Sequence, residues 1–188
     1  MEMIKGYNEA EIINDGSSSI LPKGAYQMII LGVHMQNSKS GNGKYIEFDL
    51  DVAEGEYKGF FDKLYSEAEE NKVWRCRYYV NIPLGDGSDK DAFKLRMFKT
   101  FINNVEDSNS GYTWNWNEDS LTGKLVGGLV VNQEFVSRNG EVRSGTVLAK
   151  TCPIQDVIDG TYRMPKDKKL PSFKNQFKPV EDMELPFD

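Results

Sequence analysis

Residues 44–52 alternate apolar and polar side chains without a break, and this alternation constrains the fold more than any other feature of the chain. In the segment KYIEFDLDV, one face carries Ile46, Phe48, Leu50 and Val52, and the other carries Tyr45, Glu47, Asp49 and Asp51. Successive side chains of a β-strand point to opposite faces of a sheet. We therefore expect a strand with one face on a hydrophobic core and the other face exposed to solvent.

Segments of the same kind occur along most of the chain, separated by turns rich in glycine, proline and asparagine. The expected strands are residues 25–35, 44–52, 57–64, 73–82, 124–136 and 141–151. An Asn-Gly pair at residues 139–140 predicts that the last two strands form a hairpin. Gly127 and Gly128, inside one of these strands, predict a bulge or a sharp bend.

One long helix is expected within this series of strands. Apolar residues recur at helical spacing over residues 89–104, and Ser88 followed by Asp91 resembles a capping box. A helical turn is expected near residues 153–158. Short bent strands with a single intervening helix predict a mainly β domain, a small Greek-key barrel of the OB-fold type, with an open β-sandwich as the main alternative.

The residue counts exclude several classes of protein. The 188 residues include one histidine and two cysteines, without a Cys/His metal pattern or a phosphate-binding glycine motif. We therefore expect a protein that is not an enzyme and that needs no cofactor or metal. Cys76 and Cys152 are expected to be reduced core thiols, the N-terminus does not resemble a secretion signal, and no apolar run could cross a bilayer. These features predict a cytoplasmic protein without a membrane partner.

Charge is distributed unevenly along the chain. The formal net charge is −6, but residues 163–178 are basic and residues 179–188 are acidic. Both stretches are poor in apolar residues, which predicts a disordered tail over residues 163–188, made of a basic linker and an acidic tip. The expected organisation is a flexible leader (1–20), a nucleic-acid-binding domain (21–162) and this tail.

Cations and aromatic rings are interleaved at positions expected to be exposed. Arg75, Arg77 and Tyr79 fall on one face of the strand at 73–82, opposite Trp74 and Cys76. Cations that follow a phosphate backbone, mixed with rings on which bases stack, are what single-stranded nucleic acid recognition requires. The candidate nucleic-acid-binding residues are Lys39, Lys44, Tyr45, Arg75, Arg77, Tyr79, Trp114, Trp116, Arg138 and Arg143.

Other interpretations of the same residues stay open. Arg75 and Arg77 could instead pair with carboxylates on the neighbouring strand, and a tryptophan could plug the barrel end. The alternating Glu47, Asp49 and Asp51 could hold Mg²⁺ for phosphodiester cleavage, which makes a Mg-dependent nuclease one alternative function. A module that binds only proteins, through its tail, is the other alternative.

The last eight residues, EDMELPFD, resemble the acidic C-terminal tip of bacterial and phage single-stranded DNA-binding proteins. In this interpretation a small apolar anchor, preceded by acids, enters a basic hydrophobic pocket of a partner. The expected partner-binding residues are Asp182, Glu184, Leu185, Pro186 and Phe187. Tips of that family usually end on the phenylalanine, whereas Asp188 follows here. The resemblance implies that the tip recruits host or phage replication or recombination proteins.

Residues 20–160 carry a second resemblance, to an uncharacterised phage and prophage family usually encoded among replication and recombination genes. The family pattern is L-P-x-G-x-Y, a strand, K-S-G-N/G, a second strand and G-x-Y-K-G. The matching residues are Pro22, Gly24, Tyr26, Lys39, Ser40, Gly41, Glu54, Gly55, Tyr57, Lys58 and Gly59. The resemblance implies a non-enzymatic phage single-stranded DNA-binding protein in the cytoplasm of a bacterial host cell. A second copy of the chain, forming a homo-oligomer, is a further candidate partner.

Overall fold

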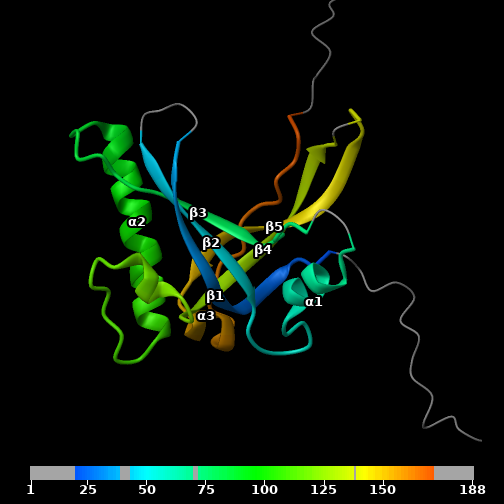
Figure 1. Cartoon of the computed structure of the whole chain (residues 1–188), viewed down its shortest axis with the longest axis horizontal. Coiled ribbons are helices and arrows are strands. Elements are labelled where there is room, and N and C mark those ends of the chain that lie inside the picture. The colour runs from blue at the N-terminus through cyan, green and yellow to red at the C-terminus, as the bar shows by residue number, and fades with distance from the viewer. Residues whose placement is uncertain (1–19, 39–42, 70–71, 138, 172–188) are drawn as a thin grey trace, which may run out of the picture.

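The computed structural model describes residues 20–38, 43–69, 72–137 and 139–171, which form a mainly β structure around one antiparallel sheet. The strands are β1 (Gly24–Asn37), β2 (Lys44–Val52), β3 (Arg77–Asn81), β4 (Leu125–Val136) and β5 (Val142–Cys152), in the order β3-β2-β1-β4-β5. The helices are α1 (Phe60–Glu67), α2 (Asp89–Ser108), α3 (Ile154–Asp159) and the short 3₁₀ helix η1 (Glu118–Leu121). In Figure 1 the hairpins β1–β2 and β4–β5 point to the same side of the view and lie apart.

The alternation predicted for residues 44–52 is confirmed in β2 for most positions. Ile46, Phe48 and Leu50 are buried, and the Phe48 ring centroid lies 4.5 Å from that of Phe101 in α2. All five strands and α2 contribute to the same hydrophobic cluster. The core therefore lies between the inward face of the sheet and α2.

The helix after β3 begins where the sequence predicts. The Ser88 hydroxyl accepts a hydrogen bond from the Asp91 backbone N–H at 3.1 Å. The Asp91 carboxylate accepts instead from the backbone N–H groups of Leu84 and Gly85, at 2.6 and 2.7 Å, so only one half of the capping box forms. None of the helices in the described ranges is long and apolar enough to cross a membrane.

The predicted barrel is not closed, because the edge strands β3 and β5 do not pair. β3 has only five residues and begins at Arg77 rather than at residue 73, since residues 72–76 lie outside the strand ladder. The register shifts leave one extra residue in β1, Leu31, and one in β5, Ala149. Such bulges bend a sheet, and β3 lies near β5. Within the described residues no backbone hydrogen bonds join these two edges. The result is a single open sheet, and neither a closed barrel nor a two-sheet sandwich.

The strand predicted over residues 57–64 is wrong, because a turn and helix α1 occupy this part of the chain. Gly59, just before the helix, has a φ of 68°, in the left-handed region that favours glycine. Asp51, predicted on the exposed face of β2, is only 3% exposed, and its carboxylate accepts from the backbone N–H groups of Phe61 and Asp62, each at 2.9 Å. A carboxylate at a helix N-terminus satisfies otherwise unpaired N–H groups and interacts favourably with the helix dipole. Asp51 therefore holds α1 against the sheet.

Close packing, rather than a bulge, requires the glycine pair of β4. A Cβ atom on Gly128 would overlap the sulfur of the fully buried Met28 and would lie 3.0 Å from Leu148 Cδ1. On Gly127 it would lie 2.8 Å from a side chain of α3 and from the sulfur of Cys152. The register irregularity falls just after these glycines. Their missing side chains let β1, β5 and α3 approach β4.

Replacing Gly128 with alanine is expected to lower the free energy of unfolding by about 1–3 kcal/mol, the usual effect of overpacking a close-packed core. Gly145→Ala in β5 is the matched control, because its nearest neighbour is the exposed ring of Phe135, which can move. Urea unfolding followed by circular dichroism measures both variants. Equal stability of the two would contradict the packing argument.

Residues 163–171 have a defined course along β4, although the sequence predicts that a disordered tail begins at residue 163. The backbone of Lys168 forms a parallel bridge with Gln133, in which Lys168 N donates to Asn132 O and Glu134 N donates to Lys168 O, at 2.9 and 2.8 Å. The pairing of β4 with β1 ends at Val130, so this edge of β4 is open to the C-terminal segment. Residues 1–19 of the predicted leader and residues 172–188 lie outside the described residues.

Candidate nucleic-acid interface

Two tyrosine rings lie beside each other on the outer face of β2 and β3, the face turned away from α2. Tyr45 and Tyr79 are diagonal neighbours across the two strands, with ring centroids 5.8 Å apart and an interplanar angle of 63°. The alternating residues Phe48 and Tyr78 pack inward on α2, so Tyr45 and Tyr79 point outward. Tyr79 is 52% exposed. The two rings therefore form an accessible aromatic surface.

Arg77 extends this surface, and two carboxylates hold it in place. Its Nε lies 3.3 Å from Glu47 Oε1 and 3.2 Å from Asp49 Oδ1. Burial alone would lower the pKa of Arg77, but the charges of Glu47 and Asp49 raise it overall, so the guanidinium stays charged. The alternative in which this arginine pairs with acids of the neighbouring strand is thus confirmed for Arg77.

The predicted contacts Lys44 and Arg75 have no ion-pair partner within the ranges the structure describes. Lys44 is exposed at the hairpin end of β2 and directly precedes Tyr45 in the chain. Arg75 is exposed just before β3 and lines a small cavity with Arg77 and Thr146 of β5. We define the β2–β3 strip as Lys44, Tyr45, Glu47, Asp49, Arg75, Arg77 and Tyr79.

The other predicted contact residues lie elsewhere. The ring centroid of Trp114 lies 5.3 Å from that of Phe98 in α2. The ring centroid of Trp116, which is 80% exposed, lies 4.6 Å from that of Trp114, so both tryptophans belong to the α2 side of the sheet. Arg143 of β5 pairs with Glu141 at 3.0 Å. Outside the described residues are Lys39, Arg138 and the tip residues Asp182, Glu184, Leu185, Pro186 and Phe187.

The three carboxylates of the nuclease alternative do not converge. Glu47 and Asp49 face Arg77, whereas Asp51 is buried and binds the N-terminus of α1. Among the residues placed by the structure, no three His, Cys, Asp or Glu side chains are arranged to hold a metal ion. The placement of these carboxylates gives the nuclease alternative no support.

A pocket that the sequence did not predict lies beside the strip, between α1 and the segment that leads into β3. This pocket, named the α1 pocket below, has a volume of about 270 Å³ and is lined by Asp49, Tyr65, Lys72, Val73, Trp74 and Arg77. Alternation over residues 73–82 places Trp74 on the buried face, but the strand begins only at Arg77. The position of Tyr65 in this pocket could not be predicted, because helix α1 was not predicted.

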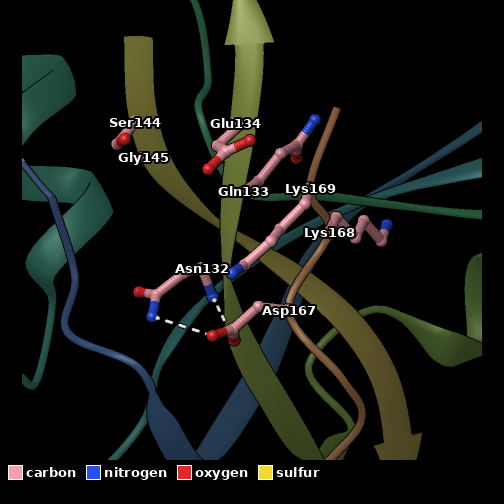
Figure 2. Close-up of a pocket in the computed structure, with 8 residues that line it drawn as sticks. All are labelled: Asn132, Gln133, Glu134, Ser144, Gly145, Asp167, Lys168 and Lys169. Atoms are coloured by element: carbon pink, nitrogen blue, oxygen red, sulfur yellow. Dashed lines mark hydrogen bonds between the residues drawn. The ribbon is translucent and has the colours of Figure 1, made fainter. Parts of the chain in front are cut away.

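A second pocket, of about 250 Å³, lies where the C-terminal segment meets β4 and β5 (Figure 2). Asp167 accepts hydrogen bonds from the backbone and side-chain N–H groups of Asn132, at 3.2 and 3.3 Å. Lys23 donates to the same carboxylate at 2.8 Å, which lowers the pKa of Asp167. Glu134 accepts from Leu170 N at 3.1 Å. Because these acids bind the C-terminal segment to the sheet, we assign this pocket no ligand.

A family model described as "Protein of unknown function (DUF669)" matches residues 7–76, which is less than half of the 188 residues. The match spans β1, β2, α1 and the segment before β3, and it stops just short of Arg77. No curated protein matches the chain.

Proposed function

We propose that the protein is a non-enzymatic single-stranded DNA-binding protein of phage or prophage origin that supports replication or recombination. The observation that carries this proposal is the ring pair of the exposed Tyr79 and the half-buried Tyr45 in the β2–β3 strip, which also contains cations. Bases stack on aromatic rings without a sequence code, and cations follow the phosphate backbone. Lys44 and Arg75 supply this charge without an ion-pair partner in the described part of the chain.

The topology supports the proposal. An OB-fold is a five-stranded, partly open Greek-key barrel that binds oligonucleotides on the face of its second and third strands and through its first and last hairpin loops. Here the strip lies on β2 and β3, and α2 follows β3. The predicted contacts Lys39 and Arg138 fall in the β1–β2 and β4–β5 connections. We therefore interpret the open sheet as an OB-like fold that lacks closure between β3 and β5.

In this proposal the acidic tip, residues 179–188, recruits replication or recombination proteins of the host or phage in the bacterial cytoplasm. What supports it is the sequence of the tip, in which Leu185 and Phe187 follow a run of acids. An apolar anchor with neighbouring charges can select a basic pocket on a partner. The tip acts in addition to the strip, so partner capture and DNA binding are separable.

Fluorescence anisotropy with a labelled oligothymidylate tests the proposal. The full chain is expected to bind the single strand at low salt and to bind a duplex of the same length more weakly. Each phosphate contact lowers the logarithm of the binding constant by about 0.7 for each tenfold rise in salt. Three contacts would therefore give a slope of roughly −2.

Two results would overturn the proposal. An absence of single-strand binding at low salt removes it directly. Cleavage of the strand in the presence of Mg²⁺ would favour the nuclease alternative, because a protein that only binds leaves the strand intact.

A further inference from the structure

We infer that the α1 pocket receives one nucleotide of the bound strand, with the base against Tyr65 and Trp74 and the phosphate at Lys72. The inference rests on the proposed function and extends the β2–β3 strip by one binding position. Arg77 connects the two, because it belongs to the strip and also lines the pocket. Neither Tyr65 nor Lys72 is among the contacts predicted from the sequence.

The aromatic walls of the pocket are held in place by the surrounding fold. The Trp74 indole N–H donates to Leu50 O of β2 at 3.0 Å, which fixes the ring orientation. Tyr65 lies on α1, whose N-terminus is bound by the buried Asp51. The two ring centroids are 5.7 Å apart with an interplanar angle of 50°. Such a pair offers a base one ring for stacking and the other as a side wall.

The pocket also contains a cation that is available to a phosphate. Lys72 Nζ lies 5.7 Å from the Tyr65 ring centroid, within the range of a cation–π contact. No described carboxylate forms an ion pair with Lys72. The pocket's own acid, Asp49, is already engaged by Arg77 and His34, each at 3.2 Å. An entering phosphate would therefore meet Lys72 as its counter-ion.

Size and position both favour a single nucleotide of a longer strand. The volume of about 270 Å³ is just below the roughly 300–1,000 Å³ of typical small-molecule sites, which suits one base better than a larger ligand. Arg77 and Tyr79 are two residues apart on the same face of β3, about 7 Å along the strand. A DNA strand with one base stacked on Tyr79 would therefore place its next nucleotide, beyond Arg77, in the pocket.

Binding measurements on three single variants test the inference. Lys72→Ala is expected to weaken oligothymidylate binding severalfold and to reduce the salt slope by about 0.7, the effect of losing one phosphate contact. Tyr65→Leu is expected to weaken binding about fivefold or more with an unchanged slope, because the ring is uncharged. Lys63→Ala is the matched control, because Lys63 is an exposed lysine of α1 that pairs with Glu67 and does not line the pocket.

Photo-crosslinking locates the nucleotide independently of affinity. An oligothymidylate carrying one 5-iodouracil is expected to form adducts at Tyr65 or Trp74 as well as at the strip. Thymidine monophosphate, at equal nucleotide concentration, is expected not to displace the strand. Displacement by the mononucleotide would identify a free-nucleotide site and overturn the inference.

The outcomes separate the inference from the proposed function. If the wild type binds and Tyr79→Ala weakens binding, while Lys72→Ala and Tyr65→Leu bind like the wild type without pocket adducts, the inference fails and the proposed function stands. If the wild type does not bind single strands, both fail. Thermal unfolding of Tyr65→Leu checks that α1 is retained, and Lys72→Ala, an exposed substitution, gives a second measurement of the same site.

Discussion

Replacing Asp51 with alanine is expected to lower the free energy of unfolding by roughly 3 kcal/mol, because several backbone N–H groups lose a charged acceptor. The carboxylate accepts from Val52 at 2.7 Å and from Phe61 and Asp62 at 2.9 Å. Asp51 itself is buried, so water cannot readily replace the lost oxygen atoms. A loss of this size is a large share of the 5–15 kcal/mol that stabilises a typical domain.

Two companion variants isolate the cause of this loss. Asp51→Asn keeps one oxygen acceptor and is expected to cost about half as much. Asp62→Ala removes an exposed carboxylate from the first turn of the same helix and is expected to cost less than about 1 kcal/mol. Urea unfolding with an unchanged m-value measures all three. Stability of Asp51→Ala within about 0.5 kcal/mol of the wild type would show that the carboxylate does not hold α1.

Asp51 also shows why part of the fold could not be predicted from the sequence. β2, α2 and the β4–β5 hairpin follow from local patterns: alternation, helical spacing with a serine cap, and an Asn-Gly turn. Helix α1 depends on a cap supplied ten residues earlier from a neighbouring strand, which no local pattern contains. Closure of the sheet likewise requires pairing between β3 and β5, which are far apart in the chain. It also depends on the length of β3, which begins only at Arg77.

The same distinction applies to the candidate site. The outward positions of Tyr45, Arg77 and Tyr79 were predictable, because alternation on β2 and β3 fixes them. The partial neutralisation of Arg77 was one of two open alternatives, and the distances to Glu47 and Asp49 decide it. The α1 pocket was not predictable, because one wall lies on the unpredicted helix and the other, Trp74, precedes the point where alternation starts.

Loss of both strip rings is expected to weaken single-strand binding by about 30-fold or more, since each stacked base contributes roughly 1–3 kcal/mol and 1.4 kcal/mol corresponds to a factor of ten. The variant is Tyr45→Ala/Tyr79→Ala, and anisotropy with the oligothymidylate measures it. Because the two rings are in contact, the losses of binding free energy in the two single variants are not expected to sum to the loss in the double variant. The salt slope should stay unchanged, since no charge is removed.

Trp116→Ala is the informative contrast to these tyrosines. Trp116 is more exposed than Tyr79, yet its ring packs at a tilt against that of Trp114 on the α2 side of the sheet, away from the β2–β3 strip. Binding through the strip therefore predicts little change for Trp116→Ala and a large loss for Tyr79→Ala. The reverse result would move the nucleic-acid interface to the loop after α2. That result would show that the exposure of a ring predicts base stacking better than the presence of cations beside it. The two variants therefore decide which of these two properties determines where the strand binds.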